Sequence, residues 1–135
     1  MSSASLALQQ AIFAALSANA DLQALIGDPP RLFDFVPRDS AFPYVVLGDG
    51  SESDWSTATE DGTEHAIQID VWSRQPGHRE AKQIGEAIRA ALNNAALSVS
   101  GATLIDIRHL ATALARQSDG QTTRAALRFR AVTEP

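Results

Sequence analysis

Three side chains near the middle of the sequence have the types and order of a metal-dependent nuclease site. Asp70 is followed by Glu80 and Lys82, which matches the PD-(D/E)xK pattern. In that pattern the acidic groups hold a divalent cation and the lysine reaches its bound water. The Glu and Lys of such a site lie on one strand, where alternate residues face the same side. The motif is therefore catalytic only if residues 80–82 form a strand.

The flanking residues predict a strand that turns into a helix. Ile69 and Val71 alternate with polar residues and are expected in the core, and a Pro-Gly pair then predicts a turn. Apolar residues recur afterwards at helical spacing: Ala81, Ile84, Ile88 and Leu92. In the first turn of a helix, Glu80 and Lys82 point about 200° apart around the axis. We therefore favour a strand-to-helix corner and keep the nuclease as a less favoured alternative.

The sequence carries no other recognisable catalytic or metal-binding motif. His65, His78 and His109 are far apart and match no metal-binding spacing, and the chain has no cysteine. The "GDGS" stretch at residues 48–51 lacks the Gly-Lys-Ser/Thr ending of a phosphate-binding loop. We therefore expect no catalytic residue, no metal and no cofactor, and we predict that the protein is not an enzyme.

Length and composition indicate a globular chain. The 135 residues fit a single domain over residues 1–135, and hydrophobic residues at 44% and charged residues at 20% are ordinary values. No apolar run approaches the roughly 20 residues of a membrane span. The N-terminal segment lacks a basic region and is expected to be helical rather than a signal peptide. These features predict a cytosolic protein without a membrane partner.

The net charge of -5 is divided unevenly along the chain. Residues 1–73 hold two basic and eleven acidic side chains, whereas residues 74–135 hold nine basic and five acidic ones. The overall negative charge disfavours a free-standing nucleic-acid binder, since such proteins attract phosphate with a basic surface. The asymmetry predicts that one half of the chain attracts the other half of a neighbouring copy.

The pattern of apolar residues and turn signals predicts an α+β domain. A helix is expected over residues 5–19, with a short helical turn after a capping Asp21, and a second main helix follows Pro76. Strands are expected at residues 31–36, 44–48 and 64–72, followed by a terminal hairpin around a type I′ turn at Asp119-Gly120. This order predicts a largely antiparallel sheet of about four to five strands, with two main helices packed on one face.

An acidic segment interrupts this pattern. Residues 49–63 contain five acidic side chains, no basic one and Trp55. The segment is long for an internal loop, which predicts either a projecting hairpin or a functional loop. Its acidic residues lack the spacing of a calcium-binding loop, which leaves a solvated loop or a surface that faces a partner or DNA. Trp55 favours a protein interface, although the ring could equally fold back on its own sheet.

Several phrases in order along the chain resemble the phage tail terminator family. These proteins are also called tail completion or head-tail joining proteins, and the family includes members encoded by gene transfer agents. The phrases cover about four fifths of the chain: "RLFDFVP", "FPYVVLG", "DWST", "DGTEHAIQIDVWSR", the helical spacing after Gly77 and Glu80, and "LRFRAVTE".

The resemblance implies a non-enzymatic structural subunit of a virion. Family members form a ring, usually a hexamer, at the head-proximal end of a tail tube, where it ends tube polymerisation and meets the head connector. The implied partners are other copies of the chain, the tail tube protein and the connector or stopper, with DNA only as passing cargo. The implied location is the bacterial cytoplasm during assembly and then the particle. A head-side stopper ring remains an alternative.

Charge and the resemblance together define a candidate interface. Its acidic part comes from the segment around Trp55, and its basic part comes from the last strand. The candidate residues are Asp49, Glu52, Asp54, Trp55, Glu60, Asp61, Arg124, Arg128 and Arg130.

Overall fold

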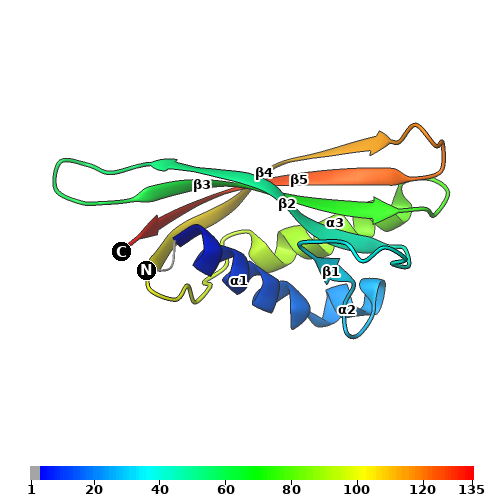
Figure 1. Cartoon of the computed structure of the whole chain (residues 1–135), viewed down its shortest axis with the longest axis horizontal. Helices are drawn as coiled ribbons and strands as arrows, with labels where there is room; N and C mark the ends of the chain where they lie inside the picture. The colour runs from blue at the N-terminus through cyan, green and yellow to red at the C-terminus, as the bar shows by residue number, and fades with distance from the viewer. Residues whose placement is uncertain (1–3) are drawn as a thin grey trace.

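A five-stranded sheet with helices on one face makes up the fold in the computed structural model, which describes residues 4–135 (Figure 1). The helices are α1 (Ala4–Ser17), α2 (Ala20–Ile26) and α3 (Arg79–Leu92). The strands are β1 (Leu32–Phe33), β2 (Tyr44–Asp54), β3 (Thr63–Ser73), β4 (Thr103–Arg116) and β5 (Thr123–Glu134). The strand order is β1-β2-β3-β5-β4, and only the β1–β2 pair is parallel. The predicted α+β class is confirmed.

The core lies between the sheet and the helices. Ile69 and Val71 of β3 are fully buried against the helices, together with Ala81 and Ile84 of α3. The strand-to-helix corner predicted from the sequence is therefore confirmed. Successive strand residues face opposite sides of the sheet, so Asp70 points to the face without helices. We call this second face the open face (Figure 1).

The two N-terminal helices form as their apolar spacing predicts, with one difference at the cap. Leu8, Ile12 and Leu16 of α1 are buried. The side chain of Asn19, rather than the predicted Asp21, caps α2, because its Oδ1 accepts a hydrogen bond from the backbone N–H of Leu22 at 2.9 Å. An Asn at this position satisfies a helix N–H that has no partner within the helix.

The first strand is shorter than the sequence predicts. Only Leu32 and Phe33 find strand partners, namely Val45 and Val46 of β2. The Arg31 carbonyl accepts a hydrogen bond from the Val45 N–H at 2.9 Å, but residues 34–36 of the predicted strand have no neighbouring strand, and Phe35 is 87% exposed. The prediction was wrong there because an apolar alternation forms a strand only where another strand can pair with it.

The C-terminal hairpin is present, but its turn differs from the prediction. The loop spans residues 117–122, and the Gln117 N–H donates to the carbonyl of Thr122 at 2.7 Å. Asp119 accepts hydrogen bonds from the backbone N–H groups of Gln121 and Thr122 and from the Thr122 hydroxyl. These bonds lower the pKa of Asp119 to about 2. They hold a wider loop, so the predicted two-residue type I′ turn was wrong.

The acidic segment forms a hairpin that projects beyond the helices. Strand β2 continues to Asp54 and pairs with β3 up to the Asp54–Thr63 pair. We call residues 49–64 the arm; it forms one end of the elongated sheet (Figure 1). Of the two arrangements that the sequence left open, the structure shows the projecting hairpin.

Candidate functional site

The sheet separates the residues of the nuclease motif. On the open face, Asp70 accepts hydrogen bonds from Gln68 Nε2 and Arg124 Nη2, both at 3.1 Å. On the helix-covered side, Glu80 Oε1 accepts a hydrogen bond from Ser73 Oγ at 2.7 Å. Ser73 and Asp70 are an odd number of positions apart on β3, so they face opposite sides of the sheet. The structure therefore does not bring the two carboxylates to one metal.

The three histidines also lie apart. His65 is buried next to the Thr133 hydroxyl at 2.9 Å, His109 contacts the Thr112 hydroxyl, and His78 is exposed before α3. Within residues 4–135, no three His, Cys, Asp or Glu side chains form a group that could hold a metal ion. In the same part of the chain, none of the helices combines the length and apolar character needed to cross a membrane.

The arm ends in an ordered turn rather than a loose loop. The Trp55 N–H donates to the carbonyl of Gly62 at 2.9 Å, and the Thr57 N–H donates to that of Glu60 at 2.7 Å. Asp54 accepts hydrogen bonds from the Ser56 hydroxyl and backbone N–H, which lower the pKa of Asp54. The turn thus holds the Asp54 carboxylate in a fixed position and favours its ionised form.

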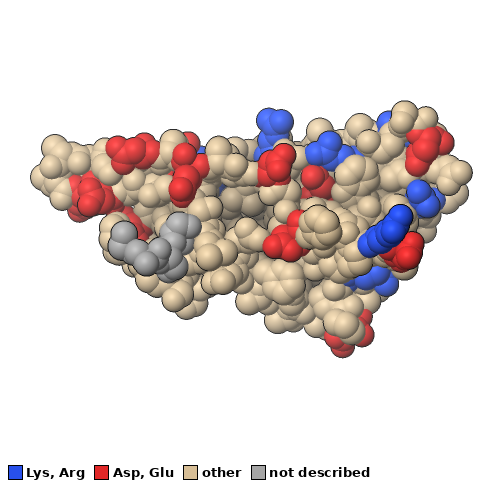
Figure 2. Space-filling model, viewed as in Figure 1, with Lys and Arg blue, Asp and Glu red and all other residues tan. Residues whose placement is uncertain are grey.

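The structure gathers the acidic candidate residues on the arm, where Figure 2 shows several carboxylates close together. All five are exposed: Asp49, Glu52, Asp54, Glu60 and Asp61. Trp55 lies among them and is 48% exposed, with the guanidinium of Arg130 at 5.7 Å from its ring centroid. The ring therefore contacts its own sheet and still offers apolar surface to a partner.

The three candidate arginines lie on the open face of β5 and are not equivalent. Arg130 pairs with Glu64 at 2.9 Å, and Arg124 pairs with Asp70 at 3.1 Å. Arg128 is exposed and has no ion-pair partner within residues 4–135. Because β5 is an interior strand, these arginines are presented by the open face and not by an edge of the sheet.

Sequence reasoning missed two basic residues at an edge and a groove at the opposite edge. Arg108 and Arg116 belong to β4, the last strand of the sheet, and both are exposed. An order of strands that puts β5 between β3 and β4 brings them to the edge. Strand order is set by long-range pairing, and the local sequence of β4 carries no signal for it.

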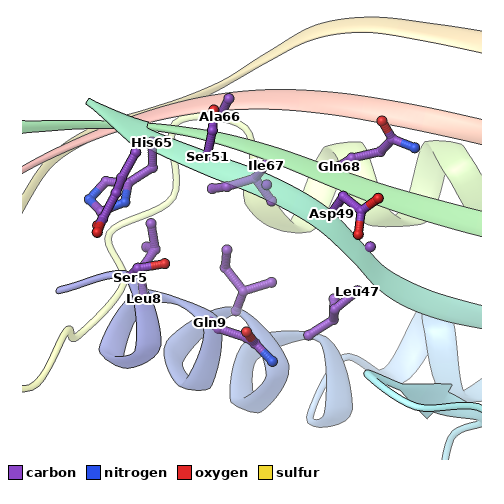
Figure 3. A pocket seen from close by; sticks show the side chains of 14 residues that line it. Ser5, Leu8, Gln9, Leu47, Asp49, Ser51, His65, Ala66, Ile67 and Gln68 are labelled. Atoms are coloured by element: carbon purple, nitrogen blue, oxygen red, sulfur yellow. The ribbon is translucent and has the colours of Figure 1, made fainter. Parts of the chain in front are cut away.

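The groove lies between α1 and the middle of β2 and has a volume of about 400 Å³ (Figure 3). Leu8 and Ile12 of α1 form one wall, and Leu47 and Ile67 of the strands form the other. Here the pairing of β2 with β3 shifts register between Leu47 and Gly50. A Cβ at Gly50 would stand 2.7 Å from a backbone oxygen, so the bulge requires glycine. The "GDG" stretch inside a strand pattern is the signal that could have indicated this bulge.

Buried His65, at the base of the arm, is expected to make the free energy of unfolding depend on pH. Burial lowers the pKa of His65, and the nearby Glu52 carboxylate opposes this in part. The unfolded chain then binds more protons below about pH 6.5, where a free histidine titrates. The contribution of His65 to the free energy of unfolding is therefore complete above about pH 6.5 and is lost as the pH falls toward the lowered pKa of His65 in the folded chain. We expect the free energy of unfolding to decrease between pH 7.5 and 5, measured by urea denaturation.

Two matched histidine variants separate the effect of His65 from the destabilisation that acid causes through other groups. His65→Gln is expected to flatten the pH dependence over that interval, whereas His78→Gln, at an exposed position, is expected to leave it unchanged. An identical slope in the wild type and His65→Gln would contradict the assignment to His65.

Fold and surface together define the class. The chain is an α+β domain with an acidic projecting arm, and its sheet separates the residues of the nuclease motif. The chain belongs to the tail completion protein gp17 family, whose model matches residues 10–134. This confirms the resemblance inferred from the sequence phrases.

Solved structures agree with this family. One chain from a structure described as the virion of a native gene transfer agent particle is 32% identical, with a TM-score of 0.91 and complete coverage of both chains. A second chain, 15% identical, shows the same fold with a TM-score of 0.55 over 94% of this chain and 95% of its own length. No protein among the curated ones matches the chain.

Proposed function

We propose that the protein forms a ring at the head-proximal end of a phage-like tail tube, ends tube polymerisation and joins the tail to the head connector. The single observation that carries this proposal is the full-length match, at 32% identity, to a chain of a gene transfer agent particle. Membership of the tail completion family supports the same role. The chain acts as a structural component and needs no cofactor.

The distribution of charge supports assembly from unlike surfaces. The arm is acidic, and the exposed basic residues Arg108, Arg116 and Arg128 belong to the other hairpin. A ring needs two different, complementary surfaces on each subunit, because every copy contacts its two neighbours differently. A hexamer fits this proposal, with the tail tube protein on one side of the ring and the connector on the other.

The passing DNA is cargo in this proposal. Carboxylates that face a channel repel phosphate, so the DNA slides instead of binding. The subunits are made in the bacterial cytoplasm, where the ring assembles, and they then remain in the particle.

Tube length provides the test. We expect purified tail tube protein to form tubes that stop growing when this chain is added, because the ring covers the growing end. Electron microscopy should show shorter tubes with a ring at one end, and native mass spectrometry should show the ring itself.

Two results would oppose the proposal. Tubes of unchanged length with no bound chain would contradict it. Binding to purified connector but never to the tube would instead support the head-side stopper. The same sample, incubated with DNA and Mg²⁺ or Mn²⁺, tests the nuclease alternative, for which cleavage that disappears in Glu80→Ala would be required.

A further inference from the structure

The sheet has an unpaired stretch of edge on each side. Strand β4 is the last strand on one side. Its outer edge is occupied at Ile107 and His109, where the Asn94 N–H donates to the Ile107 carbonyl at 2.8 Å and the His109 N–H donates to Asn93 Oδ1 at 2.9 Å. From Leu110 to Arg116 this edge has no strand neighbour within residues 4–135. On the other side, β1 pairs only with Val45 and Val46, so β2 has no outer neighbour from Leu47 to Asp54 within residues 4–135. Exposed edges offer rows of unpaired N–H and C=O groups that another strand can bind. We propose that β4 of one copy pairs with the free part of β2 in a second copy.

The β4 edge carries apolar side chains in exposed positions. Ile105 is 47% exposed and Leu110 is 60% exposed, and each lies where the pairing of β4 with β5 shifts register. Natural edge strands are usually protected by charged residues or proline. Two large aliphatic side chains on this edge strand are instead suited to burial against a partner, and Leu110 begins the stretch that has no strand neighbour.

The β2 edge has a groove with apolar walls and a polar rim beside it. The groove of about 400 Å³ opens next to the unpaired residues of β2. It is lined by Leu8, Ile12, Leu47 and Ile67 and by polar residues that include Gln9, Glu52 and Gln68. Figure 3 shows this space between α1 and the strands. A strand added to β2 would run along the mouth of the groove, where its aliphatic side chains are able to enter.

The two edges have opposite charge. The free part of β2 holds Asp49, Glu52 and Asp54 and no basic residue. The free stretch of β4, residues 110–116, holds Arg116 and no acidic residue, and the exposed Arg108 lies two positions before it. Arg108 has one internal partner, Asp106 at 3.6 Å, in an exposed ion pair of small energy. The complementarity selects a β2–β4 contact and disfavours β2–β2 and β4–β4 contacts, because like charges repel.

Strand direction also fits a ring. Strand β2 is antiparallel to β3, β3 to β5, and β5 to β4, so β2 and β4 run in opposite directions. Copies related by rotation about an axis roughly along the strands would therefore bring β4 beside β2 as an antiparallel pair, which needs no rearrangement of either strand. The contact is heterologous, so repeating it gives a ring when the rotation between copies closes, and it does not give a two-fold dimer. This edge pairing rests on the proposed function, since it describes how that ring is held together.

Charge reversal on each edge tests the pairing. The first variant is Arg108→Glu with Arg116→Glu, and the second is Glu52→Arg with Asp54→Arg; all four positions are exposed. Each variant alone is expected to bind itself about tenfold or more weakly than the wild type, because like charges then meet at every contact. A mixture of both variants is expected to form rings in which they alternate, because one contact regains opposite charges and the other is unchanged.

The readout is native mass spectrometry, with circular dichroism to show that each variant is folded. The control variant, Arg79→Glu with Lys82→Glu on α3, changes the same amount of charge at exposed positions away from both edges and should form rings as the wild type does. Rings from each edge variant alone, or none from their mixture, would overturn the edge pairing while wild-type rings still support the proposed function. A wild-type chain that stays monomeric even with tail tube protein would overturn both.

Because the chain has no cysteine, a second measurement uses single-cysteine variants. Leu110→Cys mixed with Ser51→Cys, treated with a short bismaleimide cross-linker, is expected to give the heterodimer. Homodimers alone would contradict the β2–β4 contact.

Discussion

Phe129→Ala is expected to lower the free energy of unfolding by about 3–5 kcal/mol, the usual cost of removing a buried aromatic ring. Phe129 is the largest fully buried side chain and is 1% exposed. It lies on β5 between its strand partners Ile67 and His109, and the His109 ring meets it edge-on at 5.4 Å. Neighbours on both sides prevent the site from collapsing around the missing ring.

Urea denaturation at neutral pH gives the measurement, and the neighbouring residue gives the control. Arg128→Ala removes an exposed side chain and should change the free energy of unfolding by no more than about 0.5 kcal/mol. A loss below about 1 kcal/mol for Phe129→Ala would show that the core between sheet and helices is looser than the burial indicates.

The parts of the fold that the sequence predicted correctly are those with a strong apolar period. Helix α3 has Ile84, Ile88 and Leu92 at helical spacing, and β3 has Ile69 and Val71 in alternation. In each case one face is apolar enough to select a single arrangement against the core. Burial and secondary structure therefore agree with the pattern at these positions.

The polar half of β2 belongs to the segment that the sequence left open between a projecting hairpin and a functional loop. Residues 51–54, Ser-Glu-Ser-Asp, have low strand propensity and no apolar alternation. They form a strand because β3 supplies a continuous partner up to Thr63. Long-range pairing thus overrides local propensity, and only the length of the segment indicated a hairpin.

For the candidate interface, too, the sequence showed the local features but not the long-range pairing of the strands. The sequence identified which residues are charged, and the acidic ones are exposed in the structure; their role in an interface stays a prediction. The sequence did not show which charged residues lie on interior strands and which lie on edge strands. The strand order that makes β5 interior and β4 an edge depends on pairing across the whole chain. Arg124 and Arg108 look alike in the sequence, yet Arg124 pairs with buried Asp70 on an interior strand and Arg108 is exposed on the edge strand β4.

The tip of the arm is expected to bind the tail tube or the connector and to be dispensable for folding. Its loop, residues 55–62, lies between the paired residues Asp54 and Thr63. Replacing the loop with Asn-Gly would join these two residues by the type of turn that closes a two-residue hairpin. The variant keeps every β2–β3 pair and both sheet edges, and it removes Trp55, Glu60 and Asp61.

We expect this variant to remain folded, with a free energy of unfolding within about 1 kcal/mol of the wild type, because no core residue is changed. Attachment to the tube or connector is expected to weaken by about 30-fold or more. That is the effect of losing an aromatic anchor worth about 2 kcal/mol or more at an interface. Pull-down with purified tube and connector proteins, with circular dichroism as the folding check, gives both quantities.

Trp55→Ala separates the ring from the rest of the loop. Trp55 is half-exposed beside Arg130, so it has apolar surface left to bury against a partner. We expect this substitution alone to account for most of the loss of attachment. Phe35→Ala is the matched control, because Phe35 is more exposed and lies outside the arm. If Trp55→Ala unfolds the chain, the ring is part of the core; if attachment and gene transfer are unchanged, the tip is a passive loop.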